Sequence, residues 1–229
     1  MSVNKKTEKG ILYIVSTPIG NYRDITQRAV DILNAADLII GEEYRHTTTL
    51  LKKIGIRDYQ MLTLNEHNEK EQTPEIINIL LKGSKMALIS DCGTPAFADP
   101  GTKLISRCVE MGIPVKTVPG PSSLMAAVSL SPIHLEEFYF VGFLPRKTGM
   151  RQSKIAELKK LKTPFILMDT PYRMEKLVTE IAANFGKGRR LTLALDLTKP
   201  KERLLHGTAS EILPKIIGQK AEFILIVYP

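Results

Sequence analysis

Short apolar runs alternate with amphipathic stretches along the first half of the chain. Most runs are only four or five residues long, and apolar residues at helical spacing follow them. Strands buried in a parallel sheet carry continuous apolar runs, and helices on its faces carry apolar residues every three to four positions. We expect helices capped by Asp24, opened by His46 or Thr47, and capped by Thr73 with Pro74 in the first turn. The predicted strands are residues 11–15, 37–41, 61–64, 86–89 and 114–118, and the predicted helices are residues 25–36, 46–53, 74–81 and 102–111.

The second half of the chain repeats this alternation less regularly, after a hinge-like stretch that begins Pro119-Gly120-Pro121. Strands that alternate with helices are typical of α/β proteins. We therefore predict two α/β domains: residues 1–119, with a mostly parallel sheet flanked by helices, and residues 120–229, with a mixed sheet and helices. The predicted strands of the second domain are residues 138–141, 165–168, 191–197, about 204–205 and 223–227, and its helices are residues 124–129, 151–161, 174–185 and 210–217.

Polar or Gly/Pro-rich loops follow four successive strands of the first domain. The longest, residues 90–101, contains two Pro, two Gly and two Asp. Prolines fix the backbone, and glycines let it approach a bound molecule closely. Because open α/β sheets bind ligands at the carboxyl ends of their strands, we expect a binding site at this edge. The alternative is that residues 90–101 form a purely structural turn.

Charge is distributed unevenly along the chain. The net charge is +8, but residues 1–145 hold 15 basic and 16 acidic residues, whereas residues 146–229 hold 17 and 8. Residues 146–162 alone contain seven basic residues and one acid, Glu157. Such a surplus indicates either an ordinary solvated surface or a surface that faces a polyanion, with nucleic acid as the first candidate.

Several classes of protein lack support in the sequence. No apolar run approaches the length of a membrane span, and the first run is too short for a signal peptide. Two cysteines, Cys92 and Cys108, fit a reducing cytoplasm, and four scattered histidines predict no metal site. The first loop, residues 16–21, lacks the glycine pattern of a dinucleotide site, and neither a P-loop nor a nucleophile elbow is present.

A combination of short motifs resembles one family of methyltransferases. The chain is similar to the tetrapyrrole methylase-like, S-adenosylmethionine-dependent methyltransferases. Within them it most resembles the branch that methylates a cytidine ribose 2′-hydroxyl in small-subunit ribosomal RNA. Each motif alone is weak, but their joint order is specific and spans nearly the whole chain. The motifs are residues 12–21, 24–26, 45–47, 67–69, 90–95, 99–101, 119–122, 142–145 and 197–199.

The resemblance implies S-adenosylmethionine as cofactor, held between the two domains largely by backbone groups. Asp91 has the alternative of capping its own loop. Carried onto this sequence, the cofactor contacts are the first loop (Thr17, Pro18, Ile19, Gly20), the long loop (Asp91, Cys92, Gly93, Thr94, Ala96, Phe97, Ala98), the hinge (Ser122, Ser123) and two strand ends (Met168, Ala194, Leu195).

Methyl transfer to a ribose hydroxyl requires alignment and benefits from a general base, because the hydroxyl is a poor nucleophile. The alternatives are that His46 caps its helix and that Glu42 pairs with Arg45. The catalytic candidates at the polar edge are Glu42, His46, His67 and Lys103 as bases, and Arg45 and Asn68 as positioning groups; our prediction centres on Glu42, Arg45, His46 and Asn68.

The sequence determines the methyl acceptor less well than the methyl donor. Basic residues 146–162, with Lys199, Lys201 and Arg203, are the predicted phosphate contacts. The sequence departs from the ribosomal RNA branch within residues 42–44, 169–173, 195–199 and 221–222, and it lacks that branch's C-terminal extension. A tetrapyrrole-like acceptor and a non-catalytic cofactor-binding protein therefore remain as alternatives. The resemblance also implies a cytoplasmic homodimer that works on ribosomal RNA or the small subunit.

Overall fold

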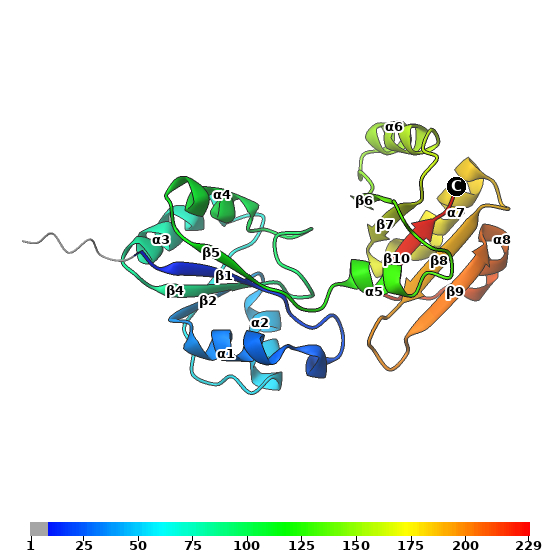
Figure 1. Ribbon diagram of the computed structural model, residues 1–229. Helices are drawn as coiled ribbons and strands as arrows, with labels where there is room; N and C mark the ends of the chain where they lie inside the picture. Colours follow the sequence, from blue (N-terminus) through cyan, green and yellow to red (C-terminus); the bar gives the residue numbers. More distant parts are fainter. Residues whose placement is uncertain (1–8) are drawn as a thin grey trace, which may run out of the picture. The chain divides into compact units, whose positions relative to one another are not determined.

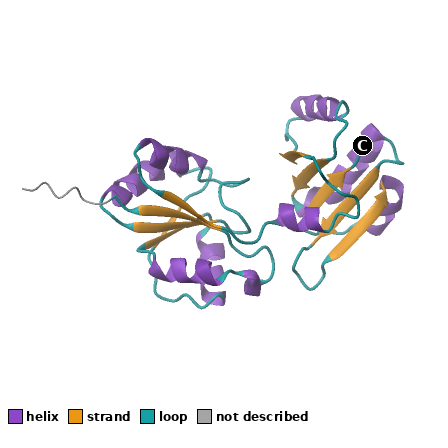
Figure 2. Cartoon of the chain, viewed as in Figure 1, coloured by secondary structure: helices purple, strands orange, loops and turns teal. Residues whose placement is uncertain are grey.

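A computed structural model describes residues 9–229. The first eight residues of the predicted first domain lie outside this description. The chain divides into two compact units, Met1–Ser122 and Ser123–Pro229. Each contains its own five-stranded sheet with helices (Figure 2). Two α/β domains, one with a parallel and one with a mixed sheet, are therefore confirmed. Within residues 9–229, no helix is long and apolar enough to cross a membrane.

The sheet of the first unit, sheet A, is entirely parallel, with strand order β3-β2-β4-β1-β5. Apolar residues point from both of its faces, as continuous apolar strands require. Helices α3 and α4 pack on one face, and α1 and α2 on the other (Figure 1). The strands are β1 (Ile11–Val15), β2 (Leu38–Gly41), β3 (Met61–Thr63), β4 (Lys85–Ile89) and β5 (Val115–Val118), and the helices are α1 (Gln27–Ala35), α2 (Tyr44–Lys53), α3 (Glu69–Leu81) and α4 (Thr102–Glu110).

The predicted starts of α1 and α2 are wrong, and for α1 a local side-chain hydrogen bond explains the difference. Thr26, not Asp24, caps α1, and its hydroxyl accepts from the Ala29 N–H at 3.1 Å. Asp24 belongs instead to a short 3₁₀ helix, η1 (Tyr22–Asp24). Helix α2 begins at Tyr44, two residues before His46.

Helix α3 begins at Glu69, five residues before the predicted start at Pro74. Asn65 and Asn68 hydrogen bond to each other's backbone immediately before it, and the Glu69 N–H donates to the Asn65 carbonyl at 3.0 Å. These bonds set the helical course early. Pro74 then lies inside the helix, and Thr73 does not cap it but donates to the Glu69 carbonyl.

The second unit has a mixed sheet, sheet B, with strand order β6-β7-β10-β8-β9. Its helix-facing core joins alternate residues of the strands to α6, α7 and α8, while α5 packs against β10. The strands are β6 (Tyr139–Phe143), β7 (Phe165–Asp169), β8 (Arg190–Leu195), β9 (Arg203–Thr208) and β10 (Phe223–Val227), and the helices are α5 (Ser123–Ser129), α6 (Thr148–Leu158), α7 (Met174–Phe185) and α8 (Ala209–Ile212).

The second unit also differs from prediction at two helices. Helix α6 begins at Thr148 and ends at Leu158, three residues before the predicted positions at both ends. The predicted helix 210–217 is only four residues of α-helix, followed by a 3₁₀ helix, η3 (Leu213–Lys215). Pro214 has no N–H to donate, which explains why the α-helical ladder stops there.

Candidate active site

The strand order of sheet A places a topological switch point at the carboxyl ends of β1 and β4. These two strands are neighbours. The chain leaves β1 for α1 on one face and leaves β4 for α4 on the other face. Where adjacent parallel strands send their connections to opposite faces, the loops separate and leave room for a ligand. The first loop, residues 16–21, and the long loop, residues 90–101, border this point.

Thr17 joins the two loops. Its side chain is fully buried, donates to the Ser90 carbonyl at 3.0 Å and accepts from the Gly93 N–H at 3.1 Å. The Thr17 N–H also donates to the Gly93 carbonyl at 2.8 Å. The hydroxyl of Thr17 is thus committed to the backbone, and a cofactor contact at this residue would come from its main chain.

The long loop is held in one conformation by its own side chains. The Ser90 hydroxyl donates to Asp99 Oδ2 at 2.5 Å and accepts from the Cys92 N–H at 3.1 Å. Gly93 has φ +86°, and a Cβ there would lie 3.2 Å from Ile19 Cγ2. Glycine is therefore required both by conformation and by the close approach of the first loop. The result is a preformed wall of backbone, the kind of surface expected for the long loop.

Five carboxylates lie along the carboxyl ends of β2, β3 and β4, and we call them the acidic edge: Glu42, Glu43, Glu66, Asp91 and Asp99. Burial and, to a smaller extent, the charges of the other four together raise the pKa of Glu42 to about 7. Burial also raises the pKa of Asp91, against the lowering effect of hydrogen bonds from His46 and the Glu43 N–H. Glu42 therefore exchanges its proton near neutral pH.

His46 does not cap α2; Glu43 occupies the N-cap position. His46 Nδ1 lies 3.1 Å from Asp91 Oδ2 and 3.4 Å from Glu43 Oε2. These three side chains form the one group in residues 9–229 with ligand atoms close enough for a metal ion, within 4.8 Å of one another. The His46–Asp91 hydrogen bond accounts for their approach, and we assign no metal to them.

Glu42 is the member of the acidic edge that remains chemically available. Asp91 is bonded to His46, Asp99 to Ser90, and Glu66 lies 3.5 Å from His67 Nε2. Across residues 9–229, Glu42 has neither a hydrogen-bonding nor an ion-pair partner, so the alternative pairing with Arg45 is not formed. A half-buried carboxylate with open lone pairs is suited to accept a proton from a substrate.

Asn68 and Lys103 have structural partners. The Asn68 side chain accepts from the Asn65 N–H at 2.7 Å and donates to the Thr63 carbonyl at 3.1 Å, so both ends of its amide serve the loop. Lys103 Nζ lies 3.5 Å from Glu69 Oε2. The geometry favours a structural role for Asn68 over the positioning role predicted for it.

Glu69 was missed as a key residue by the sequence reasoning. It is only 6% exposed, and its Oε1 accepts from the Gly101 N–H at 2.9 Å and the Lys103 N–H at 3.2 Å. Glu69 thereby caps α4, whose own N-cap residue is Gly101 and has no side chain for this purpose. A glycine directly before a predicted helix was the available signal that a distant group must supply the cap.

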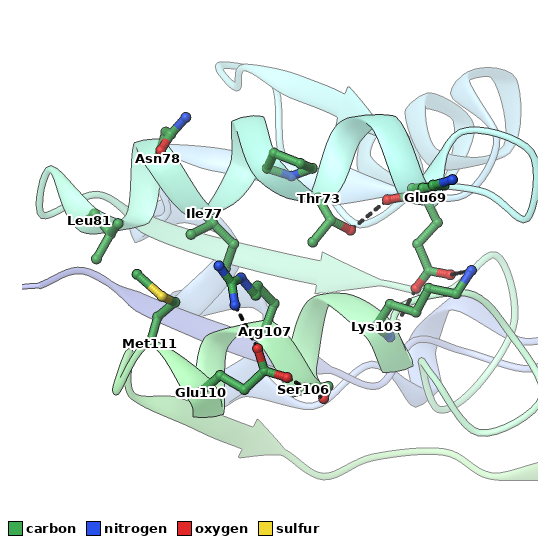
Figure 3. Close-up of a pocket in the computed structure, with 12 residues that line it drawn as sticks. Glu69, Thr73, Ile77, Asn78, Leu81, Lys103, Ser106, Arg107, Glu110 and Met111 are labelled. Atoms are coloured by element: carbon green, nitrogen blue, oxygen red, sulfur yellow. Dashed lines mark hydrogen bonds and ion pairs between the residues drawn. The ribbon is translucent and has the colours of Figure 1, made fainter.

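A hollow of about 510 Å³ lies between α3 and α4, away from the loops described above. Figure 3 shows Glu69 and Lys103 at one end of it and Leu81 and Met111 at the other. None of the predicted cofactor contacts lines it, and of the catalytic candidates only Lys103 does. We therefore place the candidate site at the acidic edge and the two loops, not in this hollow.

In the second unit, two of the predicted cofactor contacts share one face of sheet B. Met168 and Ala194 both pair with Ile224, so their side chains project from the same side. Leu195 is different: its side chain is fully buried in the helix-facing core. A contact between Leu195 and a cofactor would therefore involve its backbone alone.

The predicted phosphate-binding stretch, residues 146–162, contains one residue with a different role. Arg151 is 9% exposed, and its guanidinium binds both carboxylate oxygens of Glu180, with Nη2 2.6 Å from Oε2. A phosphate contact predicted for Arg151 is incompatible with this buried ion pair. The remaining basic residues of the stretch stay as candidates.

Comparisons with known proteins agree with this arrangement of loops. The sequence profile of the Tetrapyrrole (Corrin/Porphyrin) Methylases matches residues 11–213. The chain belongs to the tetrapyrrole methylase family. The resemblance seen in the sequence, and with it an S-adenosylmethionine-dependent methyltransferase, is confirmed.

Relatives with high coverage carry one name, Ribosomal RNA small subunit methyltransferase I. The protein from Neisseria meningitidis serogroup A is 39% identical over 96% of this chain and 76% of its own length. That from Vibrio cholerae is 37% identical over 100% of this chain and 81% of its own length. Both relatives are thus longer than the present chain.

Solved structures show the same fold at low sequence identity. A uroporphyrin-III C-methyltransferase from Thermus thermophilus, complexed with S-adenosyl homocysteine, has a TM-score of 0.68 at 17% identity and covers 96% of this chain and 97% of its own. The cobalt precorrin-4 methyltransferase CbiF has a TM-score of 0.69 at 16% identity and covers 95% of this chain and 94% of its own. These likenesses support the two-unit α/β architecture.

Proposed function

We propose that the protein transfers the methyl group of S-adenosylmethionine to the ribose 2′-hydroxyl of a cytidine in small-subunit ribosomal RNA. One observation supports this choice of methyl acceptor. The chain is related over nearly its whole length to proteins named small-subunit ribosomal RNA methyltransferases. Uroporphyrin and precorrin methyltransferases share only the fold, at 16–17% identity. A tetrapyrrole acceptor is therefore the less supported alternative.

In this proposal the donor lies against the first and long loops. Backbone groups of Thr17, Gly20 and Gly93 shape the wall, and Asp91 supplies a negative charge. The donor contributes a sulfonium cation, which a cluster of carboxylates stabilises in a partly buried site. The hinge residues Ser122 and Ser123 and the sheet B residues Met168, Ala194 and Leu195 complete the proposed set of contacts.

Glu42 is the proposed proton acceptor. The 2′-oxygen attacks the methyl carbon in line with the departing sulfur, the S–CH₃ bond breaks, and the hydroxyl proton passes to the Glu42 carboxylate. A sulfonium and a carboxylate thus become a neutral thioether and a neutral carboxylic acid. Burial, with the charges of Asp99 and Asp91, favours that result because it raises the pKa of Glu42 to about 7. His46 and Arg45 would then orient the acceptor from the first turn of α2.

Methyl transfer to small subunits tests the proposal directly. Subunits from cells that lack this protein are incubated with radiolabelled S-adenosylmethionine, and the labelled nucleotide is mapped by digestion and mass spectrometry. We expect one 2′-O-methylated cytidine. Labelling of a porphyrinoid instead would support the tetrapyrrole alternative, and donor binding without transfer to either acceptor would indicate a non-catalytic protein.

A cytoplasmic homodimer completes the proposal. It rests on the family resemblance alone. Size-exclusion chromatography with light scattering measures the mass in solution, for which a value of twice 25.6 kDa is expected. Cell fractionation followed by immunodetection tests the location.

A further inference from the structure

The topology of sheet B gathers four loops at one edge. Strands β6, β7 and β8 run parallel to one another, and β9 and β10 run antiparallel to them. The carboxyl ends of β6, β7 and β8 therefore meet the starts of β9 and β10. We call this the carboxyl edge of sheet B; it comprises residues 143–147, 170–173, 196–203 and 217–222.

Basic residues dominate this edge. Its loops contain seven basic and three acidic residues. Two of the acids, Asp196 and Glu222, share the single cation Lys199 at 3.6 and 2.7 Å. Arg146, Lys147 and Lys201 are exposed and have no partner anywhere in residues 9–229. Exposed, unpaired cations are the groups that contact phosphates.

Two aromatic rings lie among these cations. Tyr172 is 77% exposed and Phe143 is 50% exposed. Tyr172 is held by a short 3₁₀ helix, η2 (Pro171–Arg173), in which the Arg173 N–H donates to the Thr170 carbonyl. Lys220 Nζ lies over one face of the Tyr172 ring, 4.6 Å from its centre. The ring is thus held outside the core by a short turn, with a cation over one face, so a stacked base would take the other face.

The opposite edge of sheet B provides an internal comparison. It also carries exposed cations, among them Lys159, Lys160 and Lys162. Its aromatic residue, Tyr139, is 43% exposed and has Lys154 Nζ over its ring at 5.4 Å, but it follows two acids, Glu136 and Glu137, in a hollow that all three line. Charge alone therefore does not distinguish the two edges. The carboxyl edge differs in having two exposed rings among its unpaired cations, and this combination is typical of surfaces that bind single-stranded nucleic acid.

We propose that the carboxyl edge of sheet B binds unpaired ribosomal RNA, with a base stacked on Tyr172 and phosphates contacted by Arg146, Lys147 and Lys201. This inference rests on the proposed function and names the surface that holds its substrate. It also divides the basic stretch 146–162. Arg146 and Lys147 bind RNA, Arg151 is structural, and Lys159, Lys160 and Lys162 lie outside the binding surface.

Two matched triple variants test the surface. One replaces Arg146, Lys147 and Lys201 with Gln, and the other replaces Lys159, Lys160 and Lys162 with Gln, so both lose three positive charges. Binding to a small-subunit ribosomal RNA transcript is measured by filter retention at several salt concentrations. For the first variant we expect roughly ten-fold weaker binding and a salt slope smaller by about two, because each lost phosphate contact removes about 0.7 from the slope for single strands. For the second we expect a change within three-fold.

The stacking contact is tested separately at Tyr172. Tyr172→Phe keeps the ring, and Tyr172→Leu removes it while keeping an apolar side chain. We expect Tyr172→Phe to bind as the wild type does and Tyr172→Leu to bind roughly ten-fold more weakly, with little change in salt slope. Circular dichroism melting curves check that each variant is folded.

The outcomes separate this inference from the proposed function. Equal weakening by both triple variants, or none by either, overturns the assigned surface and leaves the methylation assay unaffected. Equal binding by the Leu and Phe variants overturns the stacking contact. Wild-type protein that neither binds the transcript nor methylates small subunits contradicts the proposed function itself and removes the basis of this inference.

Discussion

The carboxyl edges of the two sheets have the same position in the topology and opposite chemistry. In sheet A, five carboxylates follow β2, β3 and β4, and burial with mutual repulsion raises the pKa of Glu42 to about 7. In sheet B, seven basic residues against three acids surround two exposed rings. One edge is suited to a cationic donor and to proton transfer, and the other to a polyanion.

This difference constrains where RNA can be held. Phosphates next to the acidic edge would be repelled by its carboxylates, so the energy of RNA binding must come from a separate surface. A separate surface leaves the acidic edge free to keep Glu42 poised near neutral pH. Substitutions at the acidic edge should therefore change the rate of methyl transfer. Substitutions at the carboxyl edge of sheet B should change binding of the RNA acceptor.

The largest expected effect is the loss of methyl transfer in Glu42→Gln. Gln is close in shape but cannot accept the proton, and we expect the rate to fall by about 10²–10⁴-fold, the contribution typical of a positioned general base. Single-turnover transfer to small subunits measures it. Calorimetry should find S-adenosylmethionine binding nearly unchanged.

Glu66→Gln is the matched control at the acidic edge. Glu66 is exposed and acts on Glu42 only through its charge. The variant should keep most of the activity, while the pKa in its pH–rate profile shifts slightly downward. Equal rates for Glu42→Gln and wild type would show that another group takes the proton.

Sequence patterns were sufficient to predict the two sheets and the polar edge of the first one. They were not sufficient to predict which individual charged side chains are structural. Buried strands such as β1 and β4 carry unmistakable apolar runs, and a polar loop after each strand locates the active edge. Arg151 lies in a basic stretch, and nothing local distinguishes it from Lys147; only the fold brings Glu180 beside it. Glu69 likewise caps a helix 32 residues away. Long-range partners decide whether a charge is structural or available.

The second largest expected effect is the loss of stability in Arg151→Ala. Arg151→Ala leaves the carboxylate of Glu180 without its buried cation, and we expect a loss of about 3 kcal/mol in the free energy of unfolding. Lys147→Ala, four residues after β6 ends, should cost less than about 0.5 kcal/mol because Lys147 is exposed. Urea denaturation measures both. The double variant Arg151→Met/Glu180→Leu should regain much of the loss.

Substitutions of Glu69 test whether this acid near sheet A is structural, in contrast to the functional acid Glu42. Glu69→Ala leaves the buried N–H of Gly101 and the part-buried N–H of Lys103 without their acceptor, and we expect a loss of about 2 kcal/mol in unfolding free energy. Glu69→Gln keeps an oxygen for both donors and loses only the favourable charge at the start of α4, for which we expect about 0.5 kcal/mol. Equal losses in urea denaturation would contradict the cap.

The smallest expected effect is a pH dependence of stability from Glu42. Its pKa is about 4.5 in the unfolded chain and about 7 in the folded protein, so the folded state binds the proton more tightly. The stability that this proton contributes is complete below pH 4.5 and is lost as the pH rises to 7. Glu42→Gln should therefore be more stable than wild type at pH 8 and similar at pH 4.5. Solvent screening of the half-buried group limits the difference to about 1 kcal/mol.

Urea denaturation at pH 4.5, 6 and 8 measures that difference, with Glu75→Gln on the exposed side of α3 as the control. Asp91 and Asp99 also have raised pKa values and contribute a slope of the same sign; because they are present in every variant, only the part of their contribution that is coupled to the Glu42 charge remains in the subtraction. A Glu42→Gln variant whose advantage does not grow with pH would mean that Glu42 is already charged at low pH. The acidic edge would then serve the cationic donor alone, and the proton acceptor would have to be sought elsewhere.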